Sequence, residues 1–158
     1  MQMKKNRIYA DTSVFGGVFD DEFSLPSKRF FDEVLMGKHI VLVSEITEQE
    51  LRRAPLKVVE FANGLPAGSI EAVAITREMI DLTDAYIAAK IVSEQWYDDA
   101  AHIAIATVAK ADAIISWNFR HMVKWEKIRA YNSVNLNLGY ALINIFTPRE
   151  VISYEKEI

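Results

Sequence analysis

The 158-residue sequence contains no cysteine, which excludes disulfides, thiolate metal sites and a cysteine nucleophile. It has no apolar run that approaches the roughly 20 residues needed to cross a membrane. The basic N-terminal stretch MQMKKNRIYAD lacks the apolar segment of a signal peptide. These absences favour a soluble protein of the cytoplasm that makes no contact with a membrane.

Several common active-site motifs are also missing. The chain has no GxGxxG and no GxxxxGK[ST] loop, so nucleotide binding of those kinds is unsupported. It has no GxSxG motif, which argues against a serine hydrolase. The formal net charge of −4 does not by itself indicate nucleic-acid binding. Net charge is a weak guide, however, when acids gather round a cation and bases lie elsewhere.

The sequence does contain a regular alternation of apolar strands and helices. The predicted strands cover residues 7–11, 40–43, 70–75, 114–116 and 141–146. The predicted helices cover residues 14–19, 24–37, 44–55, 56–62, 76–92, 98–110, 124–138 and 149–155. This order predicts one α/β domain over residues 1–158, with a parallel sheet covered by helices on both faces.

Local motifs predict where some helices begin. Thr12 and Ser13 are candidate N-cap residues for the first helix, and Ser24 is the candidate for the second. Thr47 and Glu50 fit the spacing of a capping box in the third helix.

The most informative stretch is residues 97–121, YDDAAHIAIATVAKADAIISWNFRH. Asp98 and Asp99 open a helix that is apolar on almost every side, so the helix should be largely buried. A short apolar strand follows and ends in the polar and aromatic cluster WNFRH. Free carboxylates at a helix start, next to a strand that ends in polar groups, are typical of ligand sites in open α/β sheets.

Oxygen-bearing side chains follow several of the predicted strands. Asp11 ends the first strand, and Glu50 lies about one turn into the helix after the second. Asp99 begins a helix, and Asn118 follows a later strand. Because the C-terminal ends of parallel strands lie at one edge of a sheet, these side chains can meet there. Carboxylates brought together repel unless protonated or bridged by a cation, and such ligands suit Mg²⁺ or Mn²⁺.

Each candidate also has a structural interpretation. Asp11 could cap the first helix, and Glu50 could serve only as the acid of a capping box. Asp98 and Asp99 could simply complement the helix dipole, which is our interpretation of Asp98. Asn118 could be a turn or N-cap residue.

The two histidines of the 97–121 stretch are interpreted as supporting residues. Asp99 shares a helix face with His102, Ile103 and Ala106, which favours a functional role for Asp99. His102 is interpreted as a satisfied core histidine, or as one that supports the site without binding the ion. His121 is interpreted as a surface or helix-end residue rather than a base.

Four segments, in order along the chain, resemble the PIN-domain family. They are DTS after the first strand, SEITEQEL around Glu50, DxxHIAxAT from Asp99, and IISWNFRH, and together they span roughly residues 8–152. Within the family, the segments resemble those of the VapC-like toxins of bacterial toxin–antitoxin pairs. The resemblance implies a three-layer sandwich with a central five-stranded parallel sheet and helices on both faces. It also implies a metal-dependent ribonuclease that acts on RNA, is held by a cognate antitoxin protein and forms a homodimer.

The resemblance assigns roles to individual residues. Asp11, Glu50 and Asp99 match the first three acids of the PIN site and would hold Mg²⁺ or Mn²⁺. Asn118 falls where many members have a fourth acid, and it would orient a water molecule or the phosphate. The amide removes one negative charge from the site.

Further residues would support catalysis and RNA binding. Thr12 or Ser13 corresponds to a hydroxyl that often lies beside the metal. Basic side chains must guide the RNA backbone. The candidates are Arg120, Lys124 and Lys127, whose spacing of four and three residues would place them on one face of a helix.

Two other functions compete with the ribonuclease hypothesis. The first is a catalytically inactive PIN-like binding module that acts through its antitoxin or another protein. The second is a phosphatase-like hydrolase with Asp11 as nucleophile. Position 13 is serine, not the second acid that such a site requires, which argues against the phosphatase.

Overall fold

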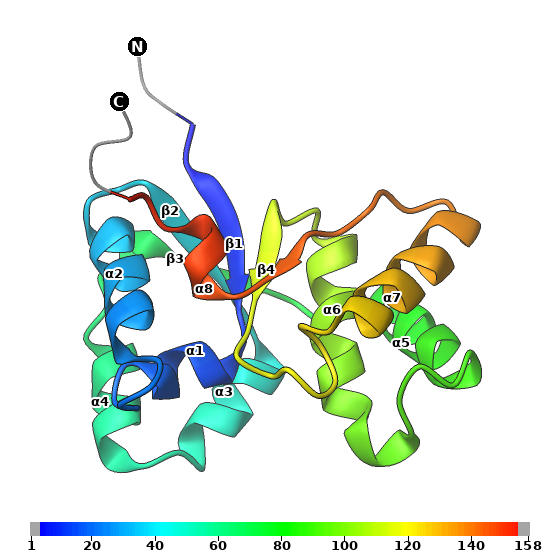
Figure 1. Cartoon of the computed structure of the whole chain (residues 1–158), viewed down its shortest axis with the longest axis horizontal. Helices are drawn as coiled ribbons and strands as arrows, with labels where there is room; N and C mark the ends of the chain where they lie inside the picture. Colours follow the sequence, from blue (N-terminus) through cyan, green and yellow to red (C-terminus); the bar gives the residue numbers. More distant parts are fainter. Residues whose placement is uncertain (1–3, 155–158) are drawn as a thin grey trace.

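The centre of the protein is a five-stranded sheet in the order β3-β2-β1-β4-β5. Figure 1 shows this computed structural model, which describes residues 4–154. Every pairing between neighbouring strands is parallel. The strands are β1 (Asn6–Ala10), β2 (His39–Ser44), β3 (Ile70–Val73), β4 (Ala113–Ile115) and β5 (Ile145–Phe146). The predicted α/β fold with a parallel sheet of this size is confirmed.

Helices cover both faces of the sheet (Figure 1). They are α1 (Thr12–Gly17), α2 (Ser24–Leu35), α3 (Glu45–Arg52), α4 (Leu56–Asn63), α5 (Arg77–Ala88), α6 (Tyr97–Val108), α7 (Trp125–Asn137) and α8 (Pro148–Val151). Short 3₁₀ turns at Ala67–Ser69 and Glu94–Trp96 precede β3 and α6. Residues of α1, α2 and α4 fill one core, whereas residues of α5, α6 and α7 fill the other. This is the three-layer arrangement that the PIN resemblance implies.

Alternate residues of the central strands enter opposite cores. Ile8 and Ala10 of β1 pack with α1 and α2, whereas Tyr9 between them belongs to the core with α5 and α6. The middle residues of the neighbouring strands do the same, Leu42 in β2 and Ile114 in β4. Side chains of a strand point to opposite faces in turn, so a strand buried on both faces reads as a continuous apolar run.

Several predicted boundaries were wrong. The last strand pairs over only two residues, Ile145 and Phe146, instead of the predicted 141–146. Helix α5 ends at Ala88, because Lys90 adopts the left-handed conformation with φ 61° and cannot continue it. Helix α8 ends at Val151, and position 155 of the predicted helix lies outside the described residues.

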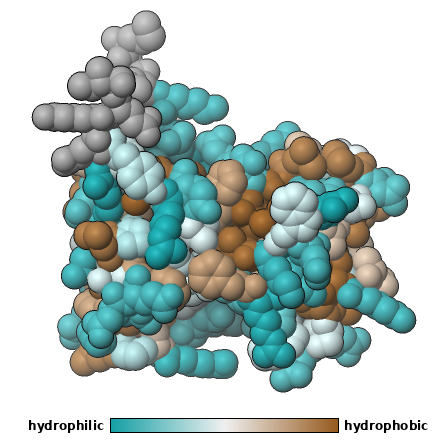
Figure 2. Space-filling view, in the orientation of Figure 1, coloured by the Kyte–Doolittle hydropathy of each residue, from teal (hydrophilic) through white to brown (hydrophobic). Residues whose placement is uncertain are grey.

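Helix α7 is buried at its middle and exposed at its ends. Tyr131 is fully buried, but Trp125 and Leu138 are 73% and 53% exposed. Hydrophobic surface is visible in Figure 2 over the connection between α7 and β5, where Leu142 is 64% exposed. The described part of the chain contains no helix long and apolar enough to span a bilayer.

Candidate metal centre

The polar ends of several elements meet at one edge of the sheet. The C-terminal ends of β1, β2 and β4 point to the lower edge in Figure 1. Asp11 follows β1, α3 follows β2, and the connection of residues 116–124 follows β4. The first turn of α6, which carries Asp99, reaches the same edge (Figure 1).

Asp11 is buried and held by two hydroxyl groups. It occupies the N-cap position of α1, yet its side chain makes no capping hydrogen bond. Its Oδ2 instead accepts hydrogen bonds from Ser13 Oγ at 2.8 Å and from Ser116 Oγ at 2.7 Å. The predicted caps, Thr12 and Ser13, lie inside α1, so that prediction was wrong. The carboxylate is oriented toward the site because it is hydrogen-bonded to two serine hydroxyls and not to the backbone at the start of α1.

Glu50 is not part of a capping box. The box that starts α3 is formed by Ser44 and Thr47, so the predicted pairing of Thr47 with Glu50 was wrong. Glu50 Oε1 accepts from Thr12 Oγ1 at 3.1 Å and contacts His102 Nε2 at 2.6 Å. Burial raises the pKa of Glu50, but the contacts with His102, Thr12 and Arg53 outweigh it and lower the pKa overall.

His102 lies fully buried beneath the two carboxylates. Its Nδ1 is 2.6 Å from Tyr9 Oη, which is 2.7 Å from Ser44 Oγ. Its Nε2 is 2.6 Å from Glu50 Oε1 and 3.5 Å from Asp11 Oδ1. Burial lowers the pKa of His102, but its contacts with Tyr9 and the two carboxylates raise the pKa well above its ordinary value.

Asp99 and Asn118 lie together beside Asp11 and His102. Burial raises the pKa of Asp99 to about 6, with the charge of Asp11 as the next cause and a hydrogen bond from Asn118 opposing both. Asn118 Oδ1 accepts from the backbone N–H groups of Arg120 and His121 at 3.1 and 2.9 Å. Since those bonds occupy the amide oxygen, the amide nitrogen is the group that faces Asp99.

The structure brings His102 closer to Asp11 and Glu50 than the sequence predicted. Asp11, Glu50 and His102 each offer one ligand atom, and these atoms lie within 4.8 Å of one another. Asp99 lies beside this group, close enough for the charge of Asp11 to raise its pKa, but it is not a member. Within residues 4–154, the group of possible metal ligands that lie closest together therefore includes His102. We had expected His102 to be a supporting residue.

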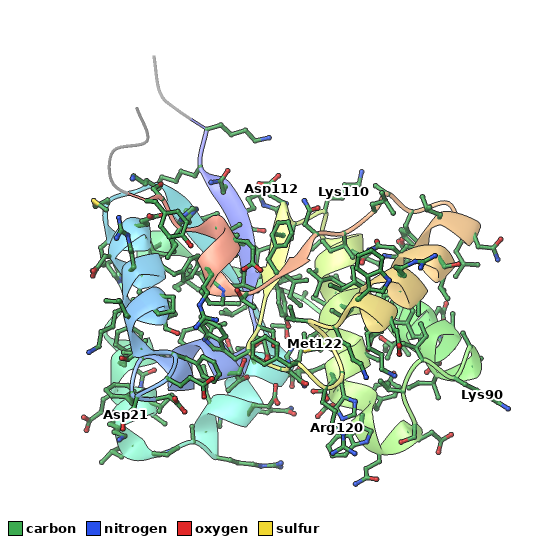
Figure 3. The ribbon with its side chains drawn as sticks, viewed as in Figure 1. Asp21, Lys90, Lys110, Asp112, Arg120 and Met122 are labelled. Atoms are coloured by element: carbon green, nitrogen blue, oxygen red, sulfur yellow. The ribbon has the colours of Figure 1, made fainter. Side chains whose placement is uncertain are left out.

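The argument that selected the basic residues was wrong. Residues 116–124 are not helical and α7 begins at Trp125, so the spacing of Arg120, Lys124 and Lys127 does not place them on one helix face. Arg120 lies with its guanidinium 5.4 Å from the ring centre of Trp96, beside the start of α6 (Figure 3). Lys124 is exposed at the N-cap of α7, whereas Lys127 Nζ donates to the carbonyl of Ile91.

Sequence reasoning missed three residues of the site. Tyr9 contacts His102, Ser116 contacts Asp11, and Arg53 lies close enough to Glu50 to lower its pKa. Tyr9 lies in an apolar strand and Ser116 directly follows one. The only sequence signal for them was a hydroxyl group within an otherwise apolar run. Arg53 follows Glu50 by three residues, which a helical pattern could have shown.

The chain matches no protein-family model and no curated protein. The function is therefore argued from the site itself.

Proposed function

We propose that this protein is a metal-dependent endoribonuclease that hydrolyses phosphodiester bonds of RNA. The main support is the convergence of Asp11, Glu50 and His102 atoms within 4.8 Å at the C-terminal edge of a parallel sheet. Asp99 adds a further carboxyl whose pKa is about 6, raised by burial and then by the charge of Asp11. A divalent cation would relieve that repulsion, and carboxylates with imidazole are ligands that such ions accept.

The residues of the site have separate roles in this proposal. A bound Mg²⁺ or Mn²⁺ supplies Lewis-acid polarisation of the phosphate and lowers the pKa of water. Asp11, Glu50 and Asp99 would hold the cation, and two serine hydroxyls keep Asp11 oriented. The Asn118 side chain, anchored by two backbone N–H groups, positions the phosphate or a water beside Asp99.

Arginines near the acidic pocket offset its charge for an RNA backbone. Arg53 lies close enough to Glu50 to lower its pKa. Arg149 is exposed and lies 4.9 Å from the ring centre of the buried Trp117, next to Asn118. These two arginines and Arg120 are the candidates for contacts with RNA phosphates.

The resemblance to VapC-like toxins supports a more specific role. We propose that the protein is the toxin of a toxin–antitoxin pair, acts in the cytoplasm, and forms a homodimer held by a cognate antitoxin protein. A small antitoxin gene beside this one, and a co-purifying complex of the two products, are the expected observations.

Substitution of Asp11 by asparagine tests the enzyme hypothesis. Asp11→Asn keeps the shape of the side chain and removes the charge that would hold the cation. We expect Mn²⁺-dependent cleavage of single-stranded RNA to fall by more than about 100-fold, with an unchanged circular dichroism spectrum.

The matched control is Asp98→Asn, which changes an exposed acid in the same first turn of α6 as Asp99. We expect its activity to stay within about twofold of wild type, since surface charges act weakly through solvent. Full activity in Asp11→Asn, or equal losses in both variants, contradicts the proposed site.

A second candidate function is a PIN-like binding module without catalysis. It is favoured by one observation: the buried His102, whose pKa is raised well above its ordinary value, can itself act as the cation between the carboxylates. Calorimetric titration with Mn²⁺ separates the two. An enzyme binds the ion and loses that binding in Asp99→Asn, whereas a module shows no heat of binding in either protein.

A further inference from the structure

We propose that His102 Nε2 is an inner ligand of the metal, so that the site selects a first-row transition-metal dication such as Mn²⁺ over Mg²⁺. This inference rests on the proposed function, because it assumes that the pocket binds a cation. It assigns a different ligand set from the three carboxylates expected from the sequence.

The distances around Nε2 support direct ligation. Nε2 lies 2.6 Å from Glu50 Oε1 and 3.5 Å from Asp11 Oδ1. Two neighbouring ligands of a six-coordinate ion with bonds of about 2.1 Å are about 3 Å apart. The observed separations lie on either side of this value and differ from it by about 0.5 Å. When an ion binds, Nε2 must release to solvent the proton that it donates to Glu50 in the metal-free protein. The Glu50 side chain is 33% exposed, which gives an ion access to the group.

The opposite side of the imidazole is held by a fixed partner. Nδ1 is 2.6 Å from Tyr9 Oη, and that hydroxyl contacts Ser44 Oγ at 2.7 Å and Thr47 Oγ1 at 3.2 Å. Metal-bound histidines characteristically use the second ring nitrogen in such a hydrogen bond, which sets the ring orientation and the tautomer. All of these residues are buried, so the ring is directed at the carboxylates before any ion binds.

The chemistry of imidazole supplies the selectivity. Mg²⁺ prefers oxygen ligands and keeps several waters, whereas nitrogen ligands favour transition metals. A carboxylate site that includes one imidazole therefore binds Mn²⁺ better than Mg²⁺, and Co²⁺ better still by the general order of divalent affinities.

The other two histidines of the chain lack this environment. His39 is 2.8 Å from Glu33 but has no second carboxylate in the described structure. His121 stacks on Trp96 with ring centres 4.5 Å apart, and its Nε2 has no hydrogen-bond partner among residues 4–154. They serve as internal controls for any signal from a metal-bound histidine.

The test is pulsed electron paramagnetic resonance of Mn²⁺ bound to the full-length protein. We expect nitrogen modulation from a directly bound imidazole in the wild type, and its change to the ¹⁵N pattern when the histidines carry ¹⁵N. The labelling needs no variant, so it holds even if a buried substitution unfolds the chain. In folded His102→Gln the modulation should vanish, while His121→Gln should retain it.

Affinity provides the second measurement. By calorimetry, His102→Gln should weaken Mn²⁺ binding by at least about tenfold and Mg²⁺ binding by less than about threefold, since only the nitrogen ligand is lost. The wild type should bind Mn²⁺ at least about tenfold more tightly than Mg²⁺. Equal affinities for the two ions contradict the proposal.

The outcomes distinguish this inference from the function on which it rests. Mn²⁺ that binds and supports RNA cleavage, but gives no nitrogen modulation, overturns the role of His102 and keeps the nuclease. Nitrogen modulation without cleavage of any RNA overturns the nuclease and keeps the metal ligand. Absence of Mn²⁺ binding at millimolar concentration overturns both and supports the binding module.

Discussion

Two buried histidines of this protein each contact a glutamate, but their surroundings differ. His39 Nε2 lies 2.8 Å from Glu33 Oε1, and both side chains are 3% exposed. His102 Nε2 lies 2.6 Å from Glu50 Oε1, with side-chain exposures of 0% and 33%. The first pair is closed on all sides, whereas the second opens to solvent through its glutamate.

The remaining partners of the His39 pair are structural. The second oxygen of Glu33 accepts from the backbone N–H of Ser153 at 2.7 Å, and Asn6 Nδ2 donates to His39 Nδ1 at 3.2 Å. Phe30 stacks on the imidazole with ring centres 5.3 Å apart. This pair therefore joins α2, β1, β2 and the segment after α8.

In the His102 pair, one carboxylate oxygen of the glutamate has no hydrogen-bond donor in the described structure. Both hydrogen bonds to Glu50 go to Oε1, and no described residue donates to its Oε2. Asp11 adds a second carboxylate, and Asp99 lies beside it. A histidine–glutamate pair therefore does not indicate a functional site by itself. Additional carboxylates around the pair do indicate one.

The largest expected difference between the pairs is in activity. Glu50→Gln removes a proposed metal ligand, so we expect cleavage of RNA to fall about 100-fold. Glu33→Gln should leave cleavage within about threefold but reduce the free energy of unfolding by about 2 kcal/mol, because a buried contact is weakened. RNA cleavage assays and urea denaturation of both variants measure this. Equal losses of activity would show that the two pairs are equivalent.

A smaller difference in Mn²⁺ affinity is expected when the hydrogen-bond partners of the two histidine Nδ1 atoms are removed. Tyr9→Phe removes the hydroxyl beside His102 Nδ1, and we expect Mn²⁺ affinity to fall about tenfold because the ring is no longer held in place. Asn6→Ala removes the partner of His39 Nδ1 and should leave Mn²⁺ affinity unchanged within error. Calorimetric titration compares them. A Tyr9→Phe protein that binds Mn²⁺ normally would remove the support for an oriented ligand.

The smallest effect concerns charge at Asp99, whose pKa is raised to about 6 by burial and then by the charge of Asp11. A carboxyl with a higher pKa in the folded protein than in the unfolded chain binds protons more readily when folded. Lowering the pH from 7 to 5 should therefore stabilise the metal-free protein, by about 1 kcal/mol or less after solvent screening. Urea denaturation at both pH values, compared with Asp99→Asn, measures this contribution, which the variant should lack. If the free energy of unfolding changes equally with pH in the two proteins, the pKa of Asp99 is not raised.

Much of the fold and part of the site could be predicted from the sequence. Buried strands and amphipathic helices alternate in the chain, and this local periodicity determined a parallel sheet covered on both faces. Placing Asp11, Glu50 and Asp99 at the end of that sheet followed from the rule that strand ends share an edge. Local signals also located the start of the helix predicted from residue 76, whose N-cap is Thr76, and the end of α2 near Gly37, which has φ 84°.

Only the tertiary structure decided which side chains face one another. The capping box of α3 is formed by Ser44 and Thr47, not by the predicted pair Thr47 and Glu50, and it leaves Glu50 free to contact His102. His102 meets Glu50 across 52 residues of chain and Tyr9 across 93. Contacts between such distant residues leave no periodic trace, because they depend on how the helices settle on the sheet and not on the backbone preferences of either segment.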